Sequence, residues 1–286
     1  MGLISKDTRK TFKIRFSGRS TDFISPSFGY GCLYNCSYCY MKRHKAEGLS
    51  IAVNTGDILT EINNHAYFTP VDKPNQTHSQ FTTYDISCNE DFALHAKYHN
   101  WRRIFEFFRD HPIAMASFAT KYVNPDLTGF DPQGKVRIRF SLMPQCKSDL
   151  HEPNTSKIID RIKAINAFID AGYDVHVNYS PIIVYDGWLE DYAEVFDMMD
   201  TYVEYKDQVL AECIFLTHNL KKHTVNLQKH PKTEVDLWVL SKQEVKTSQY
   251  GGENVRYKLG MKSEFIREFT ELHNSKIPWN KIRYIF

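Results

Sequence analysis

Three cysteines lie within eight positions near the start of the sequence, in the stretch GYGCLYNCSYCYMKRH. Cys32, Cys36 and Cys39 have the spacing C-x3-C-x2-C, and three thiolates so spaced can bind one metal centre from a single loop. A structural zinc site needs a fourth ligand, for which Cys88 or His44 is available. Three cysteines alone suit a [4Fe–4S] cluster better, with one iron left open to another ligand.

The composition is that of an ordinary globular protein, with 42% hydrophobic and 24% charged residues in 286. We find no apolar run of signal-peptide or membrane-spanning length, so we expect a cytoplasmic protein with no membrane contact. In a reducing compartment, clustered cysteines favour metal binding or chemistry over disulfides.

The charge is unevenly distributed along the chain. The net charge is only +2, but residues 219–286 contain 13 Lys or Arg against 7 Asp or Glu. This basic segment indicates a face that meets a polyanion, with a solvated lysine-rich surface as the alternative.

From about residue 50, short β-rich runs alternate with amphipathic helices. The predicted strands are LSIAV, QFTTYDIS, AMASFAT, KVRIRFSL, DVHVNYS and AECIFLT. One predicted helix carries Trp101, Ile104, Phe105 and Phe108 on a single face. Six strand–helix units predict a parallel sheet of the α/β class and fit a barrel or partial barrel, with its chemistry at the C-terminal ends of the strands.

Two of these strands alternate polar and apolar residues. In KVRIRFSL the polar set includes Arg137, Arg139 and Ser141, and in DVHVNYS it includes His176 and Asn178. If the apolar sets face the outer helices, the polar sets line the interior. We therefore expect a cavity that holds a polar ligand rather than a filled core.

The last quarter departs from the strand–helix pattern. TSQYGGENVRYKLG predicts a β-hairpin around a Gly-Gly turn, and NKIRYIF predicts a closing strand. We expect residues 1–218 to form the barrel and residues 219–286 to form a basic extension packed on it and facing nucleic acid.

The stretch CLYNCSYC resembles the signature of the radical S-adenosylmethionine (SAM) superfamily. VNTGDI, SCNED, FATKY, RIRFSL, HEPNTS, AGYDVHVNYSPIIVYDGW and RYKLGMK follow in the order and rough spacing of the spore photoproduct lyase family. The resemblance covers about residues 11–286. It implies a partial (βα)6 barrel of the radical SAM type, with the cluster in a loop after the first strand.

The resemblance also implies an activity. The family reverses 5-thyminyl-5,6-dihydrothymine, a UV cross-link between adjacent thymines, with a 5′-deoxyadenosyl radical made from SAM at a [4Fe–4S] cluster. The implied partners are UV-damaged DNA and a reductant such as flavodoxin or ferredoxin, and we expect a monomer.

Several site residues follow from the same resemblance. Cys32, Cys36 and Cys39 match the cluster ligands, and Cys88 matches the cysteine that returns a hydrogen atom to the substrate radical. Tyr38 and Tyr40 match the tyrosines that help return the hydrogen to the cofactor. The positions that match the SAM site are Lys121, Ser141, Ser180 and Asp91.

The sequence also departs from the family. Glu90 replaces a serine that contacts the cofactor, and the family's N-terminal extension has no counterpart here. The family's DNA-wedging hairpin contains a Trp-Gly-Arg-Tyr-Gly run, whereas this hairpin keeps Arg256 and Tyr257, followed by Lys258, without the tryptophan. We expect these three residues to bind nucleic acid.

Two alternatives remain. One is a radical SAM enzyme that acts on another modified nucleobase in DNA or RNA, which the changed hairpin and Glu90 favour. The other is a non-enzymatic, zinc-binding nucleic-acid protein. The remaining histidines are expected at the surface.

Overall fold

The computed structural model describes residues 3–39, 41, 48–68, 72–247 and 252–286. Its strands are β1 Ile4–Asp7, β2 Arg15–Phe16, β3 Phe23–Ile24, β4 Gly29–Gly31, β5 Leu49–Ala52, β6 Thr82–Asp85, β7 Ala114–Thr120, β8 Val136–Leu142, β9 Asp174–Ile182, β10 Leu210–Phe215, β11 Thr217–Asn219, β12 Gln243–Thr247, β13 Glu253–Tyr257 and β14 Ile282–Ile285. Its α-helices are α2 Thr55–Phe68, α3 Phe92–His95, α4 Trp101–Asp110, α5 Gln145–His151, α6 Ile158–Asp170, α7 Trp188–Tyr202, α8 Leu220–Lys229, α9 Pro231–Leu237 and α10 Leu259–Lys276.

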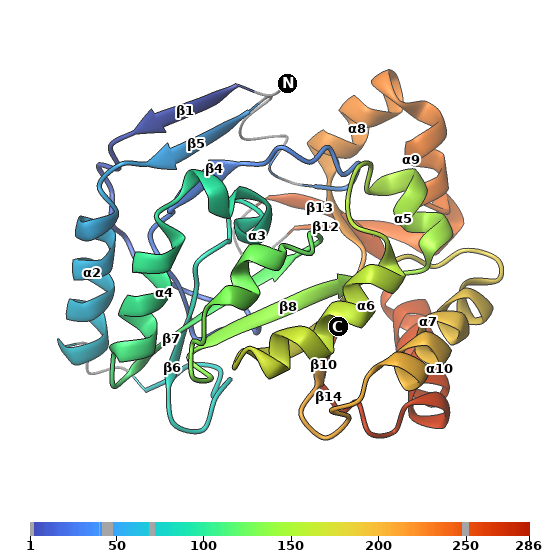
Figure 1. Ribbon diagram of the computed structural model, residues 1–286. Helices are drawn as coiled ribbons and strands as arrows, with labels where there is room; N and C mark the ends of the chain where they lie inside the picture. Colours follow the sequence, from blue (N-terminus) through green and yellow to red (C-terminus); the bar gives the residue numbers. More distant parts are fainter. Residues whose placement is uncertain (1–2, 40, 42–47, 69–71, 248–251) are drawn as a thin grey trace.

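One curled sheet organises the molecule (Figure 1). Its order is β14–β10–β9–β8–β7–β6–β3–β2 in the described part of the chain. All neighbours are parallel except β2 and β3. The predicted partial barrel is confirmed, because parallel strands joined through helices form this half-barrel.

The first barrel strand differs from the prediction. Residues Leu49–Ala52 pair with β1 and β4 in a separate three-stranded sheet. The two-residue strand Phe23–Ile24 takes the first position instead, parallel to β6. A short apolar run does not reveal which sheet it joins, so LSIAV was wrongly expected in the barrel.

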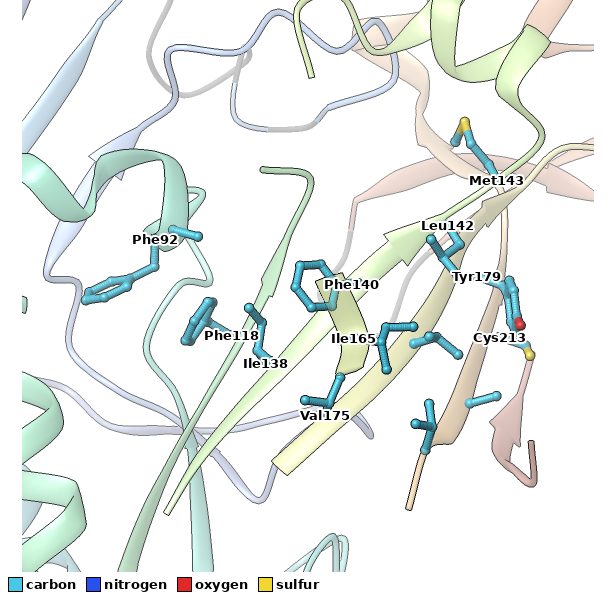
Figure 2. Packing of buried hydrophobic residues seen from close by; sticks show 14 of the residues in the cluster. Phe92, Phe118, Ile138, Phe140, Leu142, Met143, Ile165, Val175, Tyr179 and Cys213 are labelled. Carbon is cyan, nitrogen blue, oxygen red and sulfur yellow. The ribbon is translucent and has the colours of Figure 1, made fainter. Parts of the chain in front are cut away.

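The apolar faces of the strands pack against the outer helices, as predicted. Ile138 and Phe140 of β8 point toward Ile165 of α6 (Figure 2), and all three side chains are fully buried. On α4, Ile104, Phe105 and Phe108 are buried, while Trp101 packs against the same core half-buried. Because the apolar helix faces cover the apolar faces of the strands, the polar faces of the strands point into the barrel.

The barrel interior is more filled than expected. Arg139 binds Asp85 at 2.9 Å and Glu212 at 3.2 Å. Arg283 of β14 binds Glu212 at 2.6 Å, and His176 lies 3.8 Å from the same carboxylate. The polar faces of the strands line the interior, as expected. Their charged side chains pair with one another and fill part of it, so the open cavity begins only beyond these ion pairs.

Residues 219–286 are part of the same architecture. The predicted hairpin is present as antiparallel β12 and β13, and β11 pairs with β13; its turn at 248–251 lies outside the described residues. The closing strand β14 is parallel to β10 in the barrel sheet, and α10 packs on α7. The proposed boundary at 218 falls inside β11, so this segment completes the barrel as well as extending it.

Among the described residues, no helix is long and apolar enough to cross a membrane.

Candidate active site

A cavity of about 290 Å³ opens at the C-terminal ends of β6 and β7. This volume is close to the lower limit of about 300 Å³ for small-molecule pockets. Its wall combines the cysteine loop that follows β4, the segment after β6, and the end of β7. The lining residues used below are Cys32, Tyr34, Cys36, Tyr38, Cys39, Cys88, Glu90, Asp91 and Lys121.

The three loop cysteines all line this one cavity. Cys36 is buried, Cys32 and Cys39 are half-buried, and none of them is in a disulfide. Burial, followed by the charge of Asp91, raises the pKa of Cys32 to about 12, and burial with nearby Glu152 raises the pKa of Cys36. Protonated thiols of this kind bind metal by releasing protons.

The donor set fits an iron–sulfur cluster. Three thiols on one loop line one cavity, and together they could supply three of the ligands of such a cluster. No three His, Cys, Asp or Glu side chains among the described residues are placed to hold a single metal ion.

Tyr38 and Lys121 converge on a buried carboxylate that the sequence did not single out. The Tyr38 hydroxyl donates a hydrogen bond to Glu152 Oε1, Arg161 donates to Oε2 at 2.9 Å, and Lys121 Nζ lies 3.8 Å from Oε1. Burial would raise the pKa of Glu152, but Arg161 and Lys121 lower it. Glu152 is therefore ionised and orients both residues in the cavity wall.

Ser141 and Asp91 support Lys121. Lys121 Nζ donates to Ser141 Oγ at 3.5 Å, although Ser141 is not itself in the cavity wall. Asp91 accepts from the Lys121 backbone N–H at 2.9 Å, from Thr120 Oγ1 at 2.7 Å and from Leu94 N–H at 3.2 Å. Its carboxylate thus holds the end of β7 and the start of α3 beside the cavity.

Glu90 forms a second buried charge in the wall. Its Oε2 accepts from His95 Nδ1 at 3.0 Å and from His99 Nε2 at 2.9 Å. Burial would raise the pKa of Glu90, but the two histidines hold it at about 2. His95 Nε2 in turn accepts the backbone N–H of Leu33 at 3.3 Å, directly beside Cys32.

Apart from His176, which was expected to line the interior, most of the described histidines were wrongly expected at the surface. His95 is 0% exposed and His99 is 9% exposed. Further buried histidines include His151, His176, His218 and His273. Each imidazole has two ring nitrogens, so these side chains can pair with buried carboxylates and backbone groups that apolar residues would leave unsatisfied.

The remaining predicted site residues are distributed as follows. Cys88 lines the same cavity as the three loop cysteines. Ser180 lies on β9, half-buried, and is not in the wall of this cavity. Tyr40 lies outside the described residues.

The predicted nucleic-acid contacts need one correction. Tyr257 is 1% exposed, accepts the Val184 N–H at 2.8 Å, and packs among aromatic rings, so it is a core residue and not a surface contact. Arg256 is partly exposed and binds Glu244 at 2.9 Å. Lys258 is exposed, with Nζ donating to the Ser241 carbonyl at 2.9 Å.

The sequence analysis missed the residues that position other residues of the site. The sequence analysis assigned no role to Glu152, Arg161 or His95, and it noted Glu90 only as a departure from the family. These residues are hard to recognise from the sequence. Glu152 lies 114 positions from Tyr38, so no local sequence pattern indicates their hydrogen bond.

The curled parallel sheet, the three-cysteine loop and the cavity at the strand ends match the architecture that the radical SAM resemblance of the sequence implied. A solved structure described as native anSMEcpe with bound AdoMet shares the fold with a TM-score of 0.52 at 12% identity, over 91% of this chain and 65% of that chain. The family model described as spore photoproduct lyase matches residues 4–286. The chain therefore belongs to the spore photoproduct lyase family.

Individual relatives agree with this assignment. Spore photoproduct lyases of Bacillus subtilis (strain 168) and Geobacillus sp. (strain Y412MC61) are each 27% identical, over 80% and 85% of this chain and 66% and 70% of their own lengths. This chain thus spans about two thirds of the length of these relatives. A spore photoproduct lyase variant solved with AdoMet and dinucleoside spore photoproduct has a TM-score of 0.88 at 22% identity, covering 99% of this chain and 82% of that one.

Proposed function

We propose that the chain is a radical SAM lyase that reverses the thymine cross-link of spore photoproduct in UV-damaged DNA, acting as a monomer in the cytoplasm. The observation that carries this proposal is that Cys88 and Tyr38 line the same cavity as Cys32, Cys36 and Cys39. An enzyme that only abstracts hydrogen has less need of a thiol and a phenol at that place.

The cavity wall suits the cofactors. Cys32, Cys36 and Cys39 would hold a [4Fe–4S] cluster, which with SAM would supply a 5′-deoxyadenosyl radical. Lys121 carries a positive charge in the wall, because Glu152 and Cys36 raise its pKa despite burial. Glu90 Oε1 is a buried carboxylate oxygen without a hydrogen-bond partner among the described residues. A cation and an anion in one wall fit SAM, whose methionine part has a carboxylate and an ammonium group.

The chain's own residues then act on the substrate. Cys88 would give its thiol hydrogen to the thymine radical that remains after the bridge breaks. Tyr38 would return a hydrogen toward the cofactor. Ser141 steadies Lys121, and we keep Ser180, Asp91 and Tyr40 as proposed contributors.

A second candidate is a radical SAM enzyme for another modified nucleobase. The observation that favours it is Glu90, which places a negative charge where the family has a serine and so changes the charge of the wall.

Anaerobic turnover distinguishes the two candidates. Cluster-reconstituted protein with SAM and dithionite is incubated with DNA containing spore photoproduct, and restored thymine dinucleotide and 5′-deoxyadenosine (below, deoxyadenosine) are followed by mass spectrometry. Restored thymine pairs support the lyase, and Cys88→Ala should then reduce repair while deoxyadenosine still forms. Deoxyadenosine without repair in the wild-type protein would contradict the lyase and support the second candidate.

A further inference from the structure

The cysteine loop separates two cavities. Tyr34, Cys36 and Tyr38 line the cavity described above, whereas the intervening Asn35 and Ser37 line a second cavity of about 680 Å³. The second cavity lies between α5 and the α8–α9 pair, which are neighbours in Figure 1. The loop residues thus face alternately toward the candidate active site and toward this second cavity.

The walls of the second cavity hold the loop directly. Ser37 N–H donates to the His151 carbonyl at 2.9 Å, and the Ser37 hydroxyl lies 2.9 Å from His151 Nδ1. Asn226 of α8 donates to the Ser37 carbonyl at 3.2 Å. The second cavity is therefore separated from Cys36 by a single peptide unit of the loop.

The charged side chains that are exposed in the wall of the second cavity are positive. Lys221, Lys222 and Lys229 line it. Glu234 is the carboxylate in its wall, but it is 1% exposed and paired with His223 and Asn226.

A further carboxylate, Asp236, is two residues from Glu234 and is held by Lys147 at 2.7 Å and by His151 at 2.8 Å. The exposed lysines therefore present a basic rim whose neighbouring acidic groups are already neutralised.

Two apolar side chains are exposed within this basic rim. Leu150 is 47% exposed and Val225 is 41% exposed, and both line the cavity. Protein interfaces combine an apolar centre with a charged rim, whereas a nucleic-acid backbone offers phosphates and nothing that buries leucine. The combination favours an acidic protein as the occupant.

We infer that the cavity between α5 and α8–α9 is the docking site of an acidic electron-donor protein of the flavodoxin type, an inference that rests on the proposed radical SAM function. The donor is oxidised by one electron and the protein's cluster is reduced by one, with no atom transferred. The donor docks on the side of the cysteine loop that faces the second cavity. It therefore leaves the candidate active site open to SAM and DNA.

The test compares charge reversals at the rim and elsewhere. Lys221→Glu/Lys229→Glu changes two exposed lysines of the rim, and Lys13→Glu/Lys163→Glu makes the same change in charge at two exposed lysines outside it. Binding of an acidic flavodoxin to the reconstituted proteins is measured by calorimetry at low and high salt. Deoxyadenosine formation is measured with reduced flavodoxin and, separately, with dithionite.

The rim variant should bind flavodoxin about tenfold more weakly or worse, and lose flavodoxin-driven turnover while keeping dithionite-driven turnover. The control variant should match wild type. Leu150→Ser should weaken flavodoxin binding without changing affinity for DNA.

Two results would overturn the inference: flavodoxin binding unchanged in the rim variant, or a loss of DNA affinity in that variant with flavodoxin binding intact. The binding measurement needs no turnover, so it decides the inference even if the proposed lyase reaction fails with dithionite.

Discussion

The phenolic hydroxyl of Tyr38 donates a hydrogen bond to the buried carboxylate of Glu152. Glu152 is in turn fixed by Arg161, and both of these side chains are 0% exposed. Tyr38, which lies between Cys36 and Cys39 in the sequence, is thereby tied to a buried ion pair. This hydrogen bond fixes the ring of Tyr38 in the cavity wall. It directs the Tyr38 hydroxyl toward a carboxylate of the protein itself.

Tyr38→Phe tests the hydrogen-return role of this hydroxyl. The ring keeps its packing, and Glu152 keeps Arg161, so the fold and the iron content should match wild type. If Tyr38 returns hydrogen to the cofactor, the ratio of deoxyadenosine formed to lesions repaired should rise above the wild-type value in anaerobic turnover. Tyr202→Phe, at a 39% exposed tyrosine on α7, is the matched control. An unchanged ratio would remove Tyr38 from the return path.

Glu152→Gln should destabilise the protein strongly. The substitution leaves the guanidinium of Arg161 buried without its counter-charge, which typically costs about 3–5 kcal/mol. Urea unfolding of the two proteins measures the difference. Asp149→Asn breaks an exposed pair with Lys157 on the same part of the chain and should leave the midpoint close to wild type. Equal shifts for both variants would contradict this view of Glu152.

Gly29→Ala should disturb the cysteine loop. A methyl group at Gly29 would overlap the carboxylate of Glu90, which is held by two buried histidines and cannot easily move. We expect a loss of about 1–3 kcal/mol in unfolding free energy and reduced iron per chain after reconstitution, because His95 links Glu90 to Leu33.

Gly18→Ala is the control for this change. Among the described residues, and apart from its two chain neighbours, no heavy atom lies within 4 Å of the added methyl group, so both stability and iron content should be preserved. A Gly29→Ala protein with wild-type iron content would show that the loop does not depend on the position of Glu90.

Stability should fall as the pH is lowered toward 2, in part through Glu212. Burial would raise the pKa of Glu212, but Arg139, His176 and Arg283 hold it at about 2 in the folded protein, below the ordinary value of 4.5. A carboxyl with a lowered folded pKa contributes stability above its unfolded pKa and loses it as the pH falls through the folded value.

The unfolding free energy measured by urea at a series of pH values between about 5 and 2 tests this expectation. Glu212→Gln cannot take up the proton, so its curve should be flatter over that interval. Parallel curves for the two proteins would assign the acid sensitivity to other groups.

The sequence by itself determined the features that repeat locally. The spacing of Cys32, Cys36 and Cys39 indicated one metal centre. The alternation of apolar runs and helical stripes indicated a parallel sheet in a barrel or partial barrel, and the family resemblance indicated the partial barrel. These features can be recognised in a single sequence, because ligand spacing and the periods of helix and strand are properties of short segments.

Only the tertiary structure decided which segments meet. It placed Phe23–Ile24 rather than Leu49–Ala52 in the barrel and buried Tyr257 in the core. It also joined Tyr38 to Glu152 across 114 positions. It divided the surroundings of the cysteine loop into two cavities. Contacts of this kind depend on sheet order and helix packing between distant residues, and no local pattern encodes them.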